Sequence, residues 1–387
     1  LSAAGAQPMV SPDGQTAIVF NGEIYNYREL RARLEAKGER FVSNSDTEVV
    51  LALYRREGPA MLSALRGMFA LAIWDGARRG LLAARDGLGI KPLYVADSGG
   101  VVRLASQVKA LLAGAVDTTP DPAGHAGFFL WGHVPEPFTL YRGIRALPAG
   151  GWEWWGENGQ HRAGRFYDLG VELRRRRAPL PRATVDTALS DALADSVRHH
   201  MIADVPVGLF LSAGRDSATL CALAAQAAPG RLKTVTLAFE EFEGTPADEA
   251  PLAAVAAARF GTDHSLERIP GAVFATLRDR ILADMDQPTI DGVNVWFVAR
   301  AAAAQGLKVA LSGLGGDELF AGYDTFERVP RWVARMAPVS LVPGLGRLLR
   351  LAATRPARWI GHPKAAGLPE LGGTLAGGYL LRRALYL

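Results

Sequence analysis

The stretch LFLSAGRDS, residues 209–217, decides the fold of the C-terminal half, because an apolar run meets small residues just before a helical pattern. A continuous apolar strand is predicted at residues 205–211, and the helix after it carries Leu220 and Leu223 on its buried face. The helix expected before the strand has apolar residues at helical spacing, at Val185, Leu189, Leu193 and Val197. Helix, strand, glycine turn and helix are typical of a parallel α/β domain.

The turn at residues 212–217 is suited to binding phosphate. Small residues let successive backbone N–H groups and the positive end of a helix converge on one point. No Gly-Lys-Ser/Thr follows, so the turn is not a Walker A loop. A turn without that lysine is better suited to binding a departing pyrophosphate than to transferring the γ-phosphoryl group. Asp216 is then a candidate Mg²⁺ ligand. The alternative is that Asp216 and Ser217 are ordinary helix caps.

A second cluster, LSGLGGDELFAGY at residues 311–323, repeats this pattern. A strand predicted at 308–311 leads into a Ser-Gly pair, a glycine pair and the adjacent acids Asp317 and Glu318. Open α/β sheets bind ligands at the carboxyl ends of their strands. Two such turns suit an ATP whose pyrophosphate, with Mg²⁺, lies between Asp216 and Asp317.

The N-terminal half has a different pattern. Short alternating or β-branched runs separated by tight-turn residues predict antiparallel strands at 16–20, 69–74, 81–84, 93–96 and 101–105. Two helices interrupt them, one closing at Gly38 and one near Gly58. This half is therefore expected to be α+β. One more strand of the parallel sheet is predicted at 234–239.

The run DLGVELRRRRAPLPR, residues 168–182, has the composition of an exposed linker. We therefore predict an amidotransferase-like domain at residues 1–167, a linker at 168–184 and an ATP-binding domain at 185–387. The functions in these names rest on the resemblances given below.

Composition excludes several classes of protein. The formal charge is only +4 over 387 residues and no basic stripe alternates with aromatics, so we expect no nucleic-acid partner. The most apolar stretch, 339–353, is broken by Pro343 and Gly344, so we expect no membrane span. The single cysteine, Cys221, permits no intrachain disulfide and fits a reducing cytoplasm. A homodimer is compatible with the sequence.

The two turn motifs together resemble the PP-loop ATP pyrophosphatase domain (HUP-like) of asparagine synthetases, which adenylate an aspartate side chain before ammonia attacks it. The resemblance implies that the adenine lies against Phe210, Leu211 and Leu237. It further implies that Asp216 and Asp317 are Mg²⁺ ligands and that Asp248 and Glu249 line the site. The nucleotide contacts that it implies from the two turns are Ser212, Gly214, Asp216, Ser217, Ser312, Gly313, Gly315, Gly316 and Asp317.

Two departures from the family pattern stand out. The usual first motif is Ser-Gly-Gly-x-Asp-Ser, and Ala213 replaces a glycine, which is mild where the backbone does not need positive φ. Leu314 stands where many members carry a glutamate tied to the acyl-adenylate, which leaves the acceptor carboxylate open. DQPTIDGVNVWF, residues 286–297, resembles a variant of the family in which Thr289 and Asp291 are candidate acceptor contacts.

NGEIYNYREL, residues 21–30, follows a predicted strand directly and resembles the glutamine pocket of class II amidotransferases, with their N-terminal nucleophile sandwich. In that family an N-terminal cysteine attacks the glutamine amide. Asn21 and the Gly22 amide would form the oxyanion hole, Glu23 would fix the substrate and Asp46 would bind its α-amino group. SDTE, residues 45–48, reads equally well as a capping box. The stretches at 64–75 and 84–96 match the same domain.

The chain begins at Leu1 with LSAAGAQPM, which resembles an internal stretch of that domain. Three parts of the family pattern are not in this sequence. They are the cysteine-led start, the segment with an arginine for the glutamine carboxylate, and the C-terminal helical region with its lysine. The sequence therefore resembles a member truncated at both ends. We expect this stretch alone to release no glutamate from glutamine. Cys221, in the other domain and mid-helix, is expected to be a core residue.

The resemblance implies a ligase that uses ATP, Mg²⁺, glutamine and aspartate to give asparagine, AMP, pyrophosphate and glutamate, with ammonia crossing an internal channel. An enzyme of the same machinery that amidates another carboxylate, in natural-product or polysaccharide biosynthesis, is the first alternative. Retention of the glutamine-pocket residues argues against a ring-closing β-lactam synthetase. A non-catalytic degenerate homologue is the second alternative.

Overall fold

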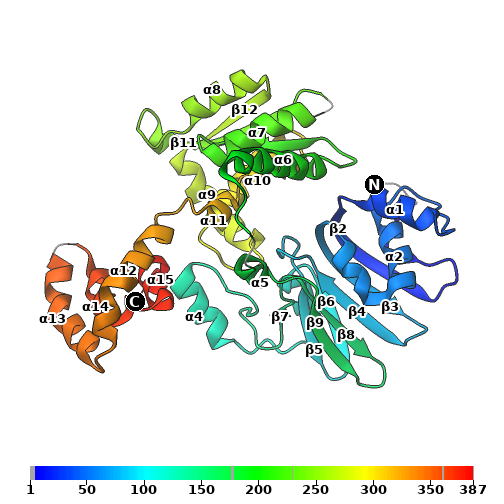
Figure 1. Ribbon diagram of the computed structural model, residues 1–387, viewed down its shortest axis with the longest axis horizontal. Coiled ribbons are helices and arrows are strands. Elements are labelled where there is room, and N and C mark those ends of the chain that lie inside the picture. The colour runs from blue at the N-terminus through cyan, green and yellow to red at the C-terminus, as the bar shows by residue number, and fades with distance from the viewer. Residues whose placement is uncertain (1–4, 176–177, 229, 360, 387) are drawn as a thin grey trace.

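The computed structural model describes residues 5–175, 178–228, 230–359 and 361–386. Its N-terminal half, up to residue 167, is built on antiparallel sheets, and its C-terminal half, from residue 182, on a parallel sheet with helices (Figure 1). The predicted order of an α+β sandwich followed by an α/β parallel-sheet domain is confirmed.

The larger antiparallel sheet has the strand order β1-β2-β3-β4-β8-β9. Its strands are β1 (Met9–Val10), β2 (Thr16–Ile24), β3 (Gly67–Asp75), β4 (Gly80–Arg85), β8 (Gly151–Gly156) and β9 (His161–Arg165). The smaller sheet has the order β6-β5-β7 and contains β5 (Tyr94–Ser98), β6 (Val101–Ala105) and β7 (Arg145–Ala146). The helices of this half are α1 (Tyr27–Glu35), α2 (Asp46–Glu57), the 3-10 helix η2 (Gly58–Ala64), α3 (Val108–Leu112) and α4 (Pro122–Trp131).

Two apolar clusters arrange this half in layers. One joins β2, β3 and β4 to the two long helices, through residues such as Ile18, Leu34 and Leu53. The other joins the opposite face of the large sheet to the small sheet, through Ala83 and Val95. Helices therefore cover one face of the large sheet and the small sheet covers the other (Figure 1).

The parallel sheet of the C-terminal half has the order β12-β11-β10-β13. Its strands are β10 (Val207–Phe210), β11 (Lys233–Phe239), β12 (Asp263–Ile269) and β13 (Val309–Leu311). One face is covered by α6 (Arg182–His200), α7 (Arg215–Ala227) and α8 (Ala250–Phe260). The other is covered by α9 (Gly271–Asp284) and α10 (Gly292–Ala304). Cys221 is fully buried in the first of these layers, as predicted, and burial raises the pKa of its thiol.

Helices complete the chain. They are the 3-10 helices η3 (Glu240–Phe242) and η4 (Pro363–Gly367), and α11 (Gly316–Phe320), α12 (Thr325–Ser340), α13 (Leu345–Trp359), α14 (Leu368–Leu371) and α15 (Leu375–Arg383). In Figure 1 helices α12 to α15 form a group of their own beside α4. Among the described residues, none of the helices combines the length and the apolar character that crossing a membrane requires.

Several sequence-based boundaries need correction. Strand β2 runs on to Ile24, so Asn21, Gly22 and Glu23 lie within it, paired with β3, and not after its end. Strand β10 begins after Pro206, because proline has no N–H to donate to the ladder. Strand β12 was not predicted. Its polar sequence, DHSLERI, lacks an apolar run and belongs to an edge strand.

The segment predicted to be a linker contains a short helix, α5 (Leu169–Arg174). Asp168 starts it by accepting a hydrogen bond from the Val171 N–H at 3.0 Å, a local capping effect that composition does not reveal. The helix buries no residue, so the expectation of exposure is confirmed for it. Arg176 and Arg177 of the charge run lie outside the described residues.

A buried carboxylate organises the turn after β4. Asp86 is 1% exposed, and its Oδ1 accepts hydrogen bonds from the N–H groups of Leu88 and Ile90 at 3.1 and 3.0 Å. Its Oδ2 accepts from the N–H groups of Phe69 and Lys91 at 3.1 and 2.9 Å. Four backbone donors thus depend on one side chain, which ties the turn to β3.

We predict that Asp86→Asn lowers the free energy of unfolding by about 3 kcal/mol or more, because one acceptor oxygen becomes a donor and leaves buried N–H groups unpaired. Urea denaturation followed by tryptophan fluorescence measures the change. Asp121→Asn is the control, since Asp121 is a half-buried helix N-cap whose side chain accepts one N–H, from Ala123, and asparagine caps equally well. Equal effects of the two substitutions would contradict the assigned role of Asp86.

Candidate functional site

The neighbouring strands β10 and β13 bring the two predicted turns together. They pair in parallel, with Val207 opposite Val309 and Leu209 opposite Leu311. Their carboxyl ends therefore lie at the same edge of the sheet, although about a hundred residues separate them in sequence. The turns at 212–217 and 312–316 face one another there.

Two serines close the first turn on itself. Ser217 is buried, and its Oγ accepts a hydrogen bond from the Ser212 N–H at 3.1 Å and lies 2.9 Å from Ser212 Oγ. Ser212 Oγ accepts in turn from the Gly214 N–H at 3.1 Å. Ala213 does not have positive φ, so alanine costs nothing there. No side chain caps α7, which removes the support for Asp216 as an ordinary cap.

Glycines of the second turn allow the two turns to touch. A Cβ on Gly316 would overlap the Asp216 carboxylate, and one on Gly313 would lie 3.1 Å from the Ser217 nitrogen. Gly315 has φ +99°, a conformation open to glycine. A Cβ on Gly322 would overlap Asp317 Oδ1. Backbone therefore packs directly against both carboxylates.

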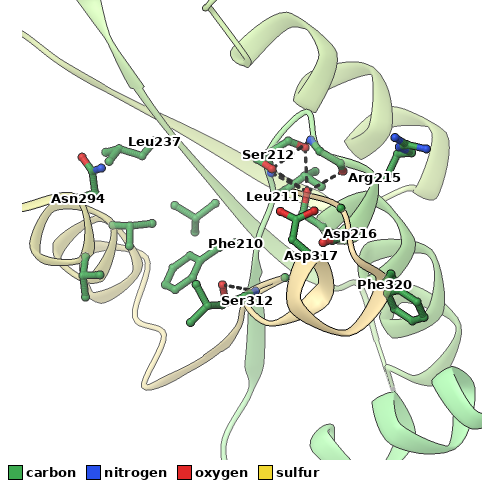
Figure 2. A pocket seen from close by; sticks show the side chains of 18 of the residues that line it. Phe210, Leu211, Ser212, Arg215, Asp216, Leu237, Asn294, Ser312, Asp317 and Phe320 are labelled. Atoms are coloured by element: carbon green, nitrogen blue, oxygen red, sulfur yellow. Dashed lines mark hydrogen bonds between the residues drawn. The ribbon is translucent and has the colours of Figure 1, made fainter. Parts of the chain in front are cut away.

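The turns border a cavity of about 850 Å³, which we call the loop cavity. The residues predicted to bind the nucleotide that line it are Phe210, Leu211, Ser212, Gly214, Asp216, Ser217, Leu237, Ser312, Gly313 and Asp317. Figure 2 shows that Phe210 and Leu237 lie toward one end and Asp216 and Asp317 toward the other. An apolar end and an acidic end suit a ligand with a flat apolar part and a phosphate tail bound to a cation.

Some predicted residues lie outside the lining of the loop cavity. Gly315 and Gly316 stand at the start of α11, and Asp248 accepts from the Ala250 N–H at 3.1 Å in the turn before α8, next to Glu249. The candidate acceptor residues also lie elsewhere. Thr289 pairs with His133 of the N-terminal half, and Thr289 Oγ1 accepts from the Asp291 N–H at 3.3 Å.

The structure adds lining residues that sequence reasoning missed. They are Arg215, Val235, Asn294, Val295, Val298, Phe320, Ala321 and Gly322. Leu314, the departure from the family pattern, also lines the cavity with 92% of its surface exposed. Asn294, Val295 and Val298 share one face of α10, so their spacing could have identified them once that helix was placed.

Carboxylates in the loop cavity could hold a magnesium ion. Mg²⁺ is typically bound through one or two carboxylates together with phosphate oxygens and waters. Asp216 and Asp317 line the same cavity and supply that number. Within the described ranges, no three histidine, cysteine, aspartate or glutamate side chains group as metal ligands. The two acids therefore fit an ion that arrives with its phosphates.

A second cavity, of about 800 Å³, lies between the two halves of the chain, and we call it the interdomain cavity. The N-terminal half contributes Gly22, Glu23 and Asp46, and the C-terminal half contributes residues that precede β10 and open β13: Ala203, Asp204, Val205, Lys308 and Val309. Strands β10 and β13 thus run from this cavity to the loop cavity.

Asn21 is the one predicted glutamine contact that does not line the interdomain cavity. Its side-chain amide donates to Ser106 Oγ at 3.0 Å. Alternation along β2 puts the side chains of Asn21 and Glu23 on the same face of the strand, so the hydrogen bond to Ser106, and not the strand face, separates Asn21 from the cavity. The structure therefore brings Gly22, Glu23 and Asp46 together at this cavity, while the Asn21 amide is bonded to Ser106.

Asp46 lies at the start of α2, where the predicted capping box forms only in part. Ser45 caps the helix by accepting from the Thr47 N–H at 3.2 Å. The Glu48 side chain does not accept from the N–H of the cap residue Ser45, as a full capping box requires, and accepts instead from the Val42 N–H at 2.9 Å. Asp46 Oδ2 accepts from the Ile24 N–H at 2.9 Å, which ties the helix to β2.

Carboxyls gather at the interdomain cavity and disfavour one another's charge. Burial, followed by repulsion from Asp46 and Asp204, raises the pKa of Glu23 to about 7. Burial also raises the pKa of Asp46, although hydrogen bonds from Ile24 and Thr47 oppose the shift. A cationic group bound here would favour ionisation of both carboxyls, so the site is suited to an amino group.

Two family models match the chain. A glutamine amidotransferase domain matches residues 1–167, and an asparagine synthase domain matches residues 188–372. Asparagine synthetase (glutamine-hydrolysing) 1 of Bacillus subtilis is 36% identical over 347 residues, 86% of this chain. Amidase chyE of Penicillium rubens is 30% identical over 84% of this chain, and asparagine synthetase B (glutamine-hydrolysing) of Escherichia coli is 33% identical over 84%.

The chain spans about half the length of the curated relatives it matches. The matches cover 53% of the Bacillus subtilis protein, 50% of the Penicillium rubens protein and 57% of the Escherichia coli protein.

We predict that Glu23→Gln stabilises the protein increasingly as pH rises. Below about pH 4.5 the Glu23 carboxyl is protonated in the folded and unfolded chain alike. Between there and about pH 7 only the unfolded chain ionises it, so rising pH lowers the stability of the wild type. A glutamine side chain does not ionise, so the variant does not lose this stability. Above pH 7 the expected difference from wild type is on the order of 1 kcal/mol, because Glu23 is partly exposed and water weakens the repulsion.

Thermal unfolding of Glu23→Gln and wild type at pH 5 and pH 8 measures this effect. Glu29→Gln, an exposed change on α1, is the control and should shift the midpoint equally at both pH values. A difference between Glu23→Gln and wild type that does not vary with pH would contradict the raised pKa.

Proposed function

This chain belongs to the glutamine-hydrolysing asparagine synthetase family, and we propose that the protein it represents makes asparagine from aspartate, glutamine and ATP. Glutamine and water give glutamate and ammonia in the N-terminal half. In the C-terminal half the aspartate side chain attacks the α-phosphorus of ATP and releases pyrophosphate. Ammonia then displaces AMP from the acyl-adenylate to give asparagine.

The observation that carries this proposal is the meeting of the two turns at the loop cavity. Asp216 packs against Gly316, and Asp317 lines the same cavity at its acidic end. These carboxylates would hold Mg²⁺, which would neutralise charge on the phosphates as pyrophosphate leaves. The apolar end, with Phe210 and Leu237, would hold the adenine.

The N-terminal half is proposed to bind glutamine in the interdomain cavity. Glu23 and Asp46 would bind the cationic α-amino group, which the raised pKa values of both carboxyls support. Asn21 and the Gly22 N–H would stabilise the oxyanion formed during attack on the amide. Ammonia would pass along β10 and β13, since the two cavities border opposite ends of these strands. The cytoplasm is the proposed compartment, because the single cysteine is a buried core residue and no disulfide is needed.

We predict that Asp216→Asn and Asp317→Asn each lower aspartate-dependent exchange of pyrophosphate into ATP by about a hundredfold or more in the full-length protein. Each change leaves the phosphate charge under-neutralised while keeping the shape of the side chain. The midpoint of unfolding should barely change, because neither side chain makes a capping bond. Asp279→Asn, at an exposed acid on α9, is the control and should retain exchange.

Undiminished exchange in both variants would contradict the phosphate assignment. The same assay with a panel of carboxylic acids tests the acceptor, since Leu314 supplies no carboxylate at the cavity. Exchange with another acid but not with aspartate would retain the mechanism and replace the product.

Asn21→Ala is predicted to lower glutamate release by about a hundredfold in the full-length protein if its amide is an oxyanion donor. Ser106→Ala is the matched variant, because it removes only the oxygen that accepts from Asn21 Nδ2, and should cost much less. If Asn21→Ala released glutamate at the wild-type rate, the side chain would have a structural role and not a catalytic one.

A further inference from the structure

The segment that precedes α10 is bound to the N-terminal half of the chain. Asp286 Oδ2 accepts a hydrogen bond from the Val108 N–H at 2.8 Å, and its Oδ1 accepts from the Lys109 N–H at 3.0 Å. Further contacts follow in the next residues. Gln287 Oε1 accepts from the Leu140 N–H at 3.2 Å, and the Ile290 N–H donates to the Gly132 carbonyl at 2.8 Å.

Asp286 acts as the N-terminal cap of α3. Gln107, at the cap position of that helix, makes no side-chain cap hydrogen bond. The first N–H groups of a helix have no partner within it, and Val108 is buried, so these groups need an acceptor from elsewhere. A carboxylate 178 residues away supplies it, and its charge is favourable at the helix N-terminus. The start of α3 therefore depends on the other half of the chain.

On the N-terminal side, α3 leads directly to the proposed glutamine site. Ser106 lies two residues before Val108, and its Oγ accepts from Asn21 Nδ2 at 3.0 Å. Asn21 is adjacent in β2 to Gly22 and Glu23 at the interdomain cavity. A change in the position of α3 would therefore reach Asn21 through one hydrogen bond and two residues of chain.

On the C-terminal side, Asp286 leads directly to the loop cavity. Helix α10 begins at Gly292, and its residues Asn294, Val295 and Val298 line that cavity. A helix moves as a rigid element over so short a distance, so a shift at its start changes the position of these side chains. Figure 2 shows Asn294 beside Leu237, at the apolar end of the cavity.

We propose that Asp286 is a positioning residue that couples glutamine hydrolysis to amidation, through Asn21, Ser106, α3 and α10. This inference rests on the proposed function. It also gives the segment at 286–291 a different role from acceptor binding, since Thr289 pairs with His133 at the same contact. Asp286 touches neither substrate and acts through the two elements that it joins.

A generic interdomain contact is available for comparison. Arg66 of the N-terminal half pairs with Asp195 of α6 at 2.8 Å, and the two side chains are 55% and 38% exposed. Exposed ion pairs contribute little, and this one touches neither α3 nor α10. Removing it tests whether any loosening between the halves has the effect assigned to Asp286.

The experiment compares glutamine with ammonia as nitrogen donor in the full-length protein. Asp286→Leu removes both acceptor oxygens at similar size. Asparagine formation from ammonia should stay within about twofold of wild type, while formation from glutamine should fall by about tenfold or more, with more glutamate released per asparagine. Asp286→Asn keeps one acceptor oxygen and should give an intermediate ratio. Arg66→Ala should keep the wild-type ratio.

A wild-type ratio of glutamate to asparagine in Asp286→Leu would overturn the inference, as would an equal rise in Arg66→Ala. Should the leucine variant fail to fold, the ratio in Asp286→Asn decides the matter, and an unchanged ratio there would overturn the inference too. Failure of the proposed function gives a different result, since the wild type would then make no asparagine even from ammonia.

Discussion

The parallel pairing of β10 with β13 is the constraint on which both cavities depend. Only this pairing places the turn after Leu211 beside the turn after Leu311. The turns then approach so closely that a Cβ on Gly316 would overlap the Asp216 carboxylate and one on Gly313 would lie only 3.1 Å from the Ser217 nitrogen. The opposite ends of the same two strands border the interdomain cavity, through Val205 and Val309. Two short strands thus join both proposed sites.

Charge is distributed unequally in the two cavities, and each distribution suits its proposed ligand. Asp216 and Asp317 line the loop cavity beside backbone that glycine keeps bare, which leaves room for an ion together with its phosphates. In the interdomain cavity, burial together with repulsion from Asp204 raises the pKa of Glu23 and of Asp46, and a bound cationic amino group would oppose these shifts. Asp204 comes from the C-terminal half, so that cavity is complete only when both halves are present.

The contact at Asp286 differs in kind from the surface ion pair between the halves. Surface ion pairs such as Arg66 with Asp195 stay in contact with water and are weak. Asp286 instead satisfies backbone N–H groups that α3 cannot pair itself, so the helix and the segment before α10 hold each other in place. Both elements continue within a few residues to a proposed site.

The sequence by itself determined the class of each half and most of the turn chemistry. Apolar periodicity and turn residues act locally, so β3, β6 and β11 were predicted within two residues at either end, the end of α2 was predicted near Gly58, and the two turns that meet at the loop cavity were identified. Polar edge strands such as β12 and caps such as Asp168 were missed, since their stability comes from a neighbouring strand or one side-chain hydrogen bond. Only the tertiary structure decided that Asn294, Val295 and Val298 line the loop cavity while Thr289 faces His133. The direction of a helix face depends on what the helix packs against, and for α10 that is β11 together with a segment held by the other half of the chain.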